Sequence, residues 1–105
     1  MATRISHMVY FELNEPTEQN VQHMLSEMKK YLDDHPGLDF FGCGVLNEEL
    51  SREVNDKNFH VSLHTVFQDR AAHDAYQVHE RHIAFIENNK ASWKKVRVFD
   101  SNLEG

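Results

Sequence analysis

The chain has 105 residues, the size of one domain, and we treat residues 1–105 as a single domain with a core over about residues 5–100. Hydrophobic residues make up 40% and charged residues 27%, which is typical of a soluble globular protein and excludes a fibrous or disordered chain. The formal net charge of −6 argues against a nucleic-acid-binding protein. No apolar run is long enough for a membrane span, and Cys43 alone excludes an internal disulfide. With no apolar signal region near Met1, we expect a cytoplasmic protein.

The first two predicted elements are a strand and an amphipathic helix. Alternation over residues 5–13 gives the strand two faces, with Ile5, His7, Val9, Phe11 and Leu13 on one and Met8 and Tyr10 on the other. Apolar residues at helical spacing then predict a helix, and they are Val21, Met24, Leu25, Met28 and Leu32. Turn residues at 14–17 begin this helix, and the segment 35–37, with its Pro and Gly, ends it.

Three more strands and a second helical region follow. The strands are predicted over residues 38–46, 59–67 and 93–100, and the polar loop 47–58 shows no core pattern. One face of the third strand consists of Phe59, Val61, Leu63, Thr65 and Phe67. In the last strand, Val96 and Val98 share one face, and Arg97 and Phe99 share the other. Asp69 is the predicted N-cap of a helix, and a second helical stretch covers about residues 80–90.

The element order β-α-β-β-α-β, with the second helical region broken in two, predicts an α+β, ferredoxin-like fold. Helices would cover one face of the antiparallel sheet. The other face would leave Met8, Tyr10 and Phe99 exposed in a monomer, and a large exposed apolar patch marks an interface. We therefore predict a homodimer through the sheet face opposite the helices.

Four segments of the chain carry a further signal. They are His7–Phe11, Pro36–Leu38, Ala75–His82 with Phe85 after it, and Trp93–Asp100. Taken together, they resemble the stress-responsive A/B barrel (Dabb) family over about residues 5–100. The resemblance implies a ferredoxin-like protomer and a dimeric α+β barrel. The family includes stress-induced proteins without assigned chemistry, and a plant polyketide cyclase that performs a cofactor-free aldol condensation in a pocket between helices and sheet.

Tyr76 and His82 match a Tyr and a His of that cyclase at the same spacing of six residues. The resemblance implies that His82 is a base and Tyr76 a hydrogen-bond donor. A carbon that enolises needs a base with a pKa near 7 and a donor for the developing oxyanion, so both residue types suit this chemistry. The alternative is structural: Tyr76 packs in the core and His82 bonds a backbone carbonyl.

The predicted ligand pocket contains ten further residues: His7, Val9, Phe11, Met28, His60, His64, His79, Phe85, Trp93 and Val96. His7 matches the first-strand His of the family, whereas Met28 stands where the cyclase has a Tyr. His60 lies seven residues before Phe67, one more than the cyclase His before its Phe. This offset turns a strand side chain to the opposite face unless a bulge absorbs it, so the register of His60 and His64 stays open.

The chain contains eight His residues, a side chain suited to proton transfer and metal binding. We expect His23, His35 and His73 on the surface. A metal site from His60 and His64 with His7 is a third alternative, but there is no HExxH motif and no His pair has an evident acidic partner. The prediction is therefore no metal and no cofactor.

Two functions remain open from the sequence. The first is a dimeric binding protein, stress-related, for a small hydrophobic or carbonyl ligand. The second is a cofactor-free acid–base enzyme that resembles the polyketide cyclase and uses His82 and Tyr76 with His7. Neither function involves nucleic acid or a membrane.

Overall fold

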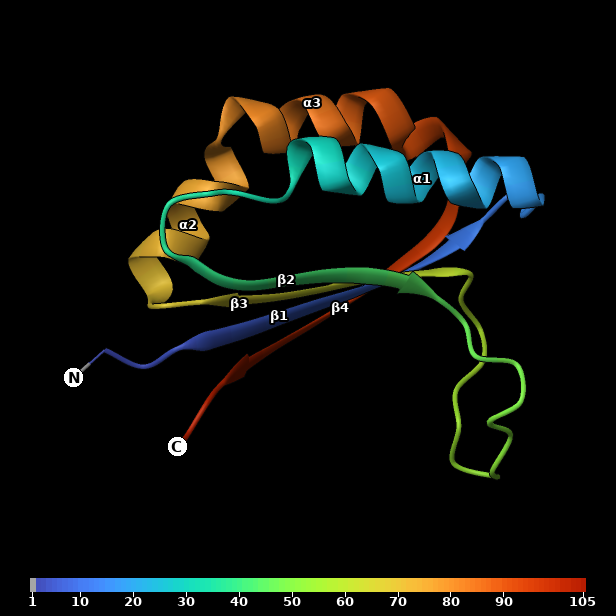
Figure 1. Cartoon of the computed structure of the whole chain (residues 1–105), viewed down its shortest axis with the longest axis horizontal. Helices are drawn as coiled ribbons and strands as arrows, with labels where there is room; N and C mark the ends of the chain where they lie inside the picture. Colours follow the sequence, from blue (N-terminus) through green and yellow to red (C-terminus); the bar gives the residue numbers. More distant parts are fainter. Residues whose placement is uncertain (1) are drawn as a thin grey trace.

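The computed structural model describes residues 2–105, and within them four antiparallel strands form one sheet with helices over one face (Figure 1). The strands are β1 (Ile5–Leu13), β2 (Leu38–Val45), β3 (Val61–Phe67) and β4 (Trp93–Asn102), in the spatial order β2-β3-β1-β4. The helices are α1 (Glu18–Tyr31), α2 (Arg70–Val78) and α3 (Glu80–Asn89), and the short 3₁₀ helix η1 (Lys90–Ser92) leads into β4. This is the predicted ferredoxin-like fold.

Helix α1 begins where the sequence predicts and ends earlier. The Thr17 hydroxyl accepts a hydrogen bond from the Asn20 backbone N–H at 3.1 Å, as an N-cap does. The helix ends at Tyr31 instead of reaching the segment 35–37, and Asp34 adopts a left-handed backbone with φ 58°. A residue before proline disfavours the helical conformation, so the chain turns before it reaches Pro36.

Helices α2 and α3 are separated by a single residue, His79. Its backbone is extended (φ −66°, ψ 140°), and its N–H donates to the Tyr76 carbonyl at the end of α2. Its imidazole Nδ1 accepts from the Arg81 N–H at 3.1 Å and so caps the start of α3. His79 therefore ends one helix and begins the next, which is the predicted break.

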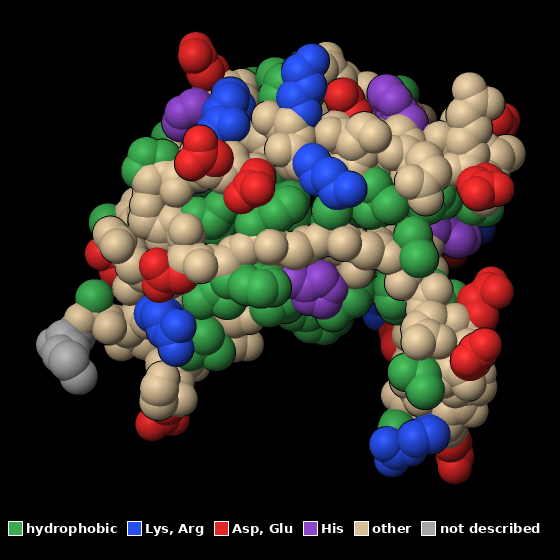
Figure 2. Space-filling view, viewed as in Figure 1, with side chains coloured by type: hydrophobic (Ala, Val, Ile, Leu, Met, Phe, Trp, Pro, Cys, Tyr) green, Lys and Arg blue, Asp and Glu red, His purple; other side chains and the backbone are tan. Residues whose placement is uncertain are grey.

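The two faces of the sheet differ as predicted for β1. On the helix side, Val9 and Phe11 are buried in a core to which α1 contributes the fully buried Met28. On the opposite face, which we call the open face, Phe40 and Phe99 are 55% and 50% exposed. Figure 2 shows hydrophobic side chains along this underside of the sheet.

The predicted start of the third strand was wrong. Strand β3 begins at Val61, so the alternation does not extend back to Phe59. The Phe59 ring instead packs edge-on against Tyr10 of the open face, with 4.9 Å between ring centroids. Residue 59 therefore lies on the side of the sheet opposite to the predicted one.

The loop 46–60 between β2 and β3 projects past the open face as an arm (Figures 1 and 2). Asp56 of this arm forms an ion pair with Arg97 of β4 at 2.5 Å, which links the arm to the edge of the sheet. None of the helices described over residues 2–105 is long and apolar enough to cross a membrane.

Candidate functional site

A cavity of about 160 Å³ lies between the sheet and the helices. The structure brings together here eight of the residues selected from the sequence: His7, Val9, Phe11, Tyr76, His82, Phe85, Trp93 and Val96. Strands β1 and β4 form the floor, and α2, α3 and the C-cap of α1 form the roof. The lining is mostly apolar, with a few polar groups from separate elements, which is the usual composition of a small-molecule site.

Tyr76 and His82 meet in this lining because of the break at His79. In one continuous helix, residues six apart point in directions about 120° apart. The break turns α3 so that the two rings lie 4.6 Å apart, centroid to centroid. The backbone break at His79 thus places both residues of the predicted pair at one cavity.

Both members of this pair carry a buried polar atom with no hydrogen-bond partner among residues 2–105. These atoms are the Tyr76 hydroxyl and the His82 Nδ1. A buried polar group without a partner costs about 1–3 kcal/mol of folding free energy, so natural proteins keep few of them. A ligand oxygen at the cavity would provide the missing partner.

Burial also sets the protonation of the pair. Desolvation lowers the pKa of His82 to about 4; the neighbouring His7 adds to this shift, and a hydrogen bond with the Gln77 backbone opposes it. Desolvation raises the pKa of Tyr76 above its usual range. At neutral pH the imidazole is therefore uncharged, with one nitrogen able to accept, and the phenol keeps the proton that it can donate.

His7 is held by a residue that the sequence prediction did not include in the site. Its Nδ1 lies 2.5 Å from the Asp100 carboxylate, and the two residues are direct partners in the β1–β4 register. Asp100 stands in a segment already used for the family resemblance, but its pairing with a residue 93 positions away follows only from strand register. Gln77 also lines the cavity and was not predicted.

The remaining predicted pocket residues lie elsewhere. His60 precedes β3 and accepts the Leu13 N–H on Nδ1 at 2.9 Å, beside the start of α1. His64 lies on the open face, where its ring nitrogens contact the sulfur of Met8 at 3.1 Å and the hydroxyl of Ser62 at 3.0 Å. The structure therefore does not place His60 and His64 at the Tyr76–His82 cavity.

Met28 and His79 also lie outside the cavity lining. Met28 is fully buried in the core beneath α1. His79 caps α3, and its ring packs against His35 at 4.8 Å between centroids. Both support the fold around the cavity.

Of the three histidines predicted on the surface, His23 is exposed, but His35 is not. His35 is 5% exposed, and its ring packs against Tyr76 with Nε2 2.8 Å from the Tyr31 carbonyl. Burial lowers its pKa. His73 is half-buried, and its ring centroid lies 5.2 Å from that of His7. The turn after α1 and the packing of α2 cover these rings, which no local pattern reveals.

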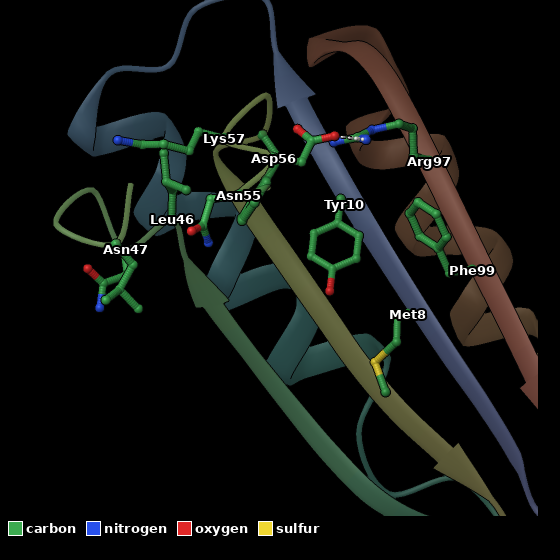
Figure 3. Close-up of a pocket in the computed structure, with 11 residues that line it drawn as sticks. Met8, Tyr10, Leu46, Asn47, Asn55, Asp56, Lys57, Arg97 and Phe99 are labelled. Atoms are coloured by element: carbon green, nitrogen blue, oxygen red, sulfur yellow. Dashed lines mark hydrogen bonds and ion pairs between the residues drawn. The ribbon is translucent and has the colours of Figure 1, made fainter. Parts of the chain in front are cut away.

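A second cavity, of about 450 Å³, lies on the open face (Figure 3). Met8 and Tyr10 of β1 and Phe99 of β4 form its base, and the arm 46–60 forms its wall. The ion pair between Asp56 and Arg97 closes one end, as Figure 3 shows. The base of this cavity is thus apolar, and its wall carries the charged side chains of the arm.

Comparisons with known proteins agree with this architecture. A Dabb family protein with a ferredoxin-like fold from Mesorhizobium loti superimposes with a TM-score of 0.80 at 24% identity, over 98% of this chain and 99% of that one. A dimeric ferredoxin-like protein of unknown function from Thermobifida fusca gives 0.80 at 17% identity, over 98% and 93%. A hydroxynitrile lyase from Passiflora edulis gives 0.78 at 12% identity, over 99% and 96%.

No curated protein matches the chain in sequence. The family model described as "Stress responsive A/B Barrel Domain" matches residues 5–103, which is nearly the whole chain. The chain therefore belongs to the stress-responsive A/B barrel, or Dabb, family.

Proposed function

We propose that this protein binds a small, largely apolar molecule whose carbonyl or hydroxyl oxygen lies between Tyr76 and His82. The observation that carries the proposal is the pair of buried, unpartnered polar atoms, judged over residues 2–105, on two side chains that line one cavity. A ligand oxygen would accept from the phenol, and a ligand hydroxyl would donate to the imidazole. Apolar cavities of about 150 Å³ hold molecules of the size of benzene, so we expect a ligand with one small ring or a short chain.

The same geometry supports acid–base chemistry on a carbonyl compound as a second candidate. Neutral His82 can take a proton from a carbon or hydroxyl, while Tyr76 stabilises negative charge on the neighbouring oxygen. The Passiflora edulis protein of the same fold is a hydroxynitrile lyase, so the fold accommodates an enzyme. With a pKa near 4, however, His82 is a weak base, which places binding before catalysis as our first proposal.

The open face is proposed as the homodimer interface. Phe40 and Phe99 are half-exposed there, and such a patch is covered in most soluble proteins. The ferredoxin-like protein from Thermobifida fusca is described as dimeric. A second copy would cover the apolar base, and the arm 46–60 would border it. The partner would also remove the open-face cavity from solvent.

The binding proposal can be tested with acetophenone and its oxygen-free counterpart, ethylbenzene. Trp93 is the only Trp of the chain and lines the cavity, so its indole N–H signal in NMR reports occupancy. We expect both compounds to shift this signal, with acetophenone bound more tightly. Tyr76→Phe should weaken acetophenone by about tenfold, the value of one hydrogen bond, and leave ethylbenzene unchanged.

The same variant has a second expected result. Removing the unpartnered hydroxyl should raise the free energy of unfolding by about 1 kcal/mol, measured in urea. Tyr31→Phe is the control, because the Tyr31 hydroxyl contacts Asn88 at 3.4 Å on the surface, and it should change stability by less than about 0.5 kcal/mol. Equal affinity for the two compounds, or a Tyr76→Phe protein that is less stable and binds normally, would contradict the proposal.

A further inference from the structure

At the end of the sheet near the start of α2, three metal-binding side chains from three elements come together. His7 lies on β1, Asp100 on β4 and His73 on α2, and one ligand atom from each lies within 4.8 Å of the others. Their positions, 7, 73 and 100, are too far apart in sequence to form a motif. The sequence alone showed no acidic partner for a pair of histidines. Strand register and the packing of α2 bring Asp100 next to His7 and His73 and so provide that partner.

We propose that His7, His73 and Asp100 bind one divalent transition-metal ion. Two imidazoles and one carboxylate form the ligand set of many zinc and non-haem iron sites that keep a position open for water or another ligand. Mg²⁺ and Ca²⁺ prefer sets made of oxygen atoms, so this set favours Zn²⁺ over them.

The surroundings of the three side chains fit a site that an ion can enter. His7 is buried, the His73 side chain is 15% exposed and the Asp100 side chain is 49% exposed. His73 and Asp100 also line an open groove beside the start of α2. The set thus runs from the protein interior to solvent, with the anchored His7 at the inner end.

The geometry requires only small side-chain movements. Zn²⁺ binds imidazole nitrogen and carboxylate oxygen at about 2.0–2.2 Å, so the ligand atoms of a tetrahedral site lie about 3.4 Å apart. The 2.5 Å contact between His7 Nδ1 and Asp100 must open while His73 approaches, and the ion takes the place of the hydrogen-bonded proton, which is released to solvent. The exposed Asp100 side chain has the freedom to make this change.

The hydrogen bonds around His73 favour ligation by one of its nitrogens. Its Nδ1 contacts the Asp74 carboxylate at 3.0 Å, whereas Nε2 has only a long contact of 3.5 Å with the Gln77 side-chain amide, so Nε2 is the nitrogen that an ion would bind in place of Gln77. A carboxylate bound to the outer nitrogen of a metal-ligating His fixes the ring and raises its basicity. Asp74 is thus a positioning residue for the proposed site.

Among the described residues that line the groove, one side chain, Arg70, carries a positive charge that would repel a metal ion. Arg70 lies in the same groove, but its guanidinium is bound to Asp74 at 2.9 Å. Asp69 and Asp100 add two carboxylates to the groove. The local charge, with Asp74 included, is therefore negative overall, which suits a divalent cation.

Isothermal titration of chelator-treated protein without a His tag tests the site, with ZnCl₂ as the probe and MgCl₂ as the hard-cation comparison. We expect about one Zn²⁺ per chain with a Kd of about 10 µM or below, and no Mg²⁺ binding at that concentration. His73→Gln and Asp100→Asn should each weaken Zn²⁺ by at least about tenfold, and Asp74→Asn by about 10–100-fold. His23→Gln, which changes an exposed His on α1, should bind as the wild type does.

Two further measurements keep the result unambiguous. Circular dichroism and the unfolding midpoint of each variant show whether it is folded. The visible absorption of Co²⁺-loaded protein reports the ligand set, and it should change in His73→Gln. Zn²⁺ binding near zero, or binding that persists unchanged in both His73→Gln and Asp100→Asn, would overturn the proposal. His7 belongs to both sites, but the substituted residues His73 and Asp100 are absent from the Tyr76–His82 cavity lining, so this outcome can be distinguished from that of the acetophenone experiment.

Discussion

Among single residues, the histidines show how burial gives one side chain several roles. His23 is a solvated surface group, whereas His35 is covered by the turn after α1 and by Tyr76. His82 lines the cavity as a neutral ring, and His7 pairs with Asp100. Counting histidines indicates that proton or metal chemistry is feasible, but it does not separate these roles, because each depends on neighbours distant in sequence.

The buried histidines predict how stability depends on pH. The pKa of His82 is about 4 in the fold and 6.5 in the unfolded chain, so between these values the unfolded chain binds more protons. The stability contributed by neutral His82 is complete above about pH 6.5 and is lost as the pH falls towards 4. His35, whose pKa is also lowered by burial, acts in the same direction.

Urea unfolding at several pH values between about 5 and 7.5 measures this effect. His82→Gln should show a smaller loss of stability on acidification than the wild type, with the remaining loss due to His35 and the other titrating groups. His23→Gln is the control and should follow the wild-type slope, because this side chain is exposed on the surface of α1. An unchanged slope in His82→Gln would show that His82 is not buried as a neutral group.

Among the elements, the junction of α2 and α3 brings Tyr76 and His82 together at the cavity. Tyr76 is buried in the last turn of α2, and His82 lies in the first turn of α3. His79 holds the two helices at an angle by a backbone bond to one and a ring bond to the other. Two residues six apart can point into the same cavity here because this break changes the direction of the helix between them.

Substitution of His79, the N-cap of α3, tests whether this residue holds the junction of α2 and α3. His79→Ala removes the acceptor for the Arg81 N–H and should lower the free energy of unfolding by about 1 kcal/mol, a usual value for an N-cap. His79→Asn restores a capping oxygen and should recover most of the loss, although both variants lack the ring contact with His35. Urea unfolding of the wild type and the two variants measures these free energies. Equal losses of stability in His79→Ala and His79→Asn would assign the effect to the lost ring contact and not to the cap.

At the scale of the whole molecule, the position of the sheet explains why its strands carry apolar residues on both faces. Helices cover the side that carries Val9 and Phe11, and the open face keeps Tyr10 and Phe99 accessible. The arm 46–60, linked to the sheet through Asp56 and Arg97, borders that face. This patch is the surface through which we propose that two copies of the chain associate.

Light scattering over a range of concentrations tests the proposed dimer. Phe99→Asp places a charge in the apolar base of both copies and should weaken association by at least about 100-fold, since two buried aromatic contacts are lost. Ile83→Asp is a matched control, because Ile83 is 48% exposed on α3, close to the 50% of Phe99, but lies away from the open face. A wild-type monomer, or equal effects of the two substitutions, would exclude this interface.

The sequence by itself determined the elements and their order, because the patterns that specify them are local. Alternation from Ile5 to Leu13 and helical spacing in α1 each lie within a single segment. Together with chain order, they lead to the ferredoxin-like sheet with a covered and an open face. The pair Tyr76 and His82 was predicted from the resemblance to the cyclase, which has a Tyr and a His at the same spacing of six residues.

Only the tertiary structure decided which distant side chains meet. His7 faces Asp100 because β1 and β4 pair in one register, and His73 reaches them because α2 packs over that end of the sheet. His60 bonds Leu13 instead of entering the cavity, since β3 begins at Val61, two residues later than predicted. Register and helix packing depend on the summed burial of many side chains. A shift of one residue reverses every contact, so no local pattern encodes them.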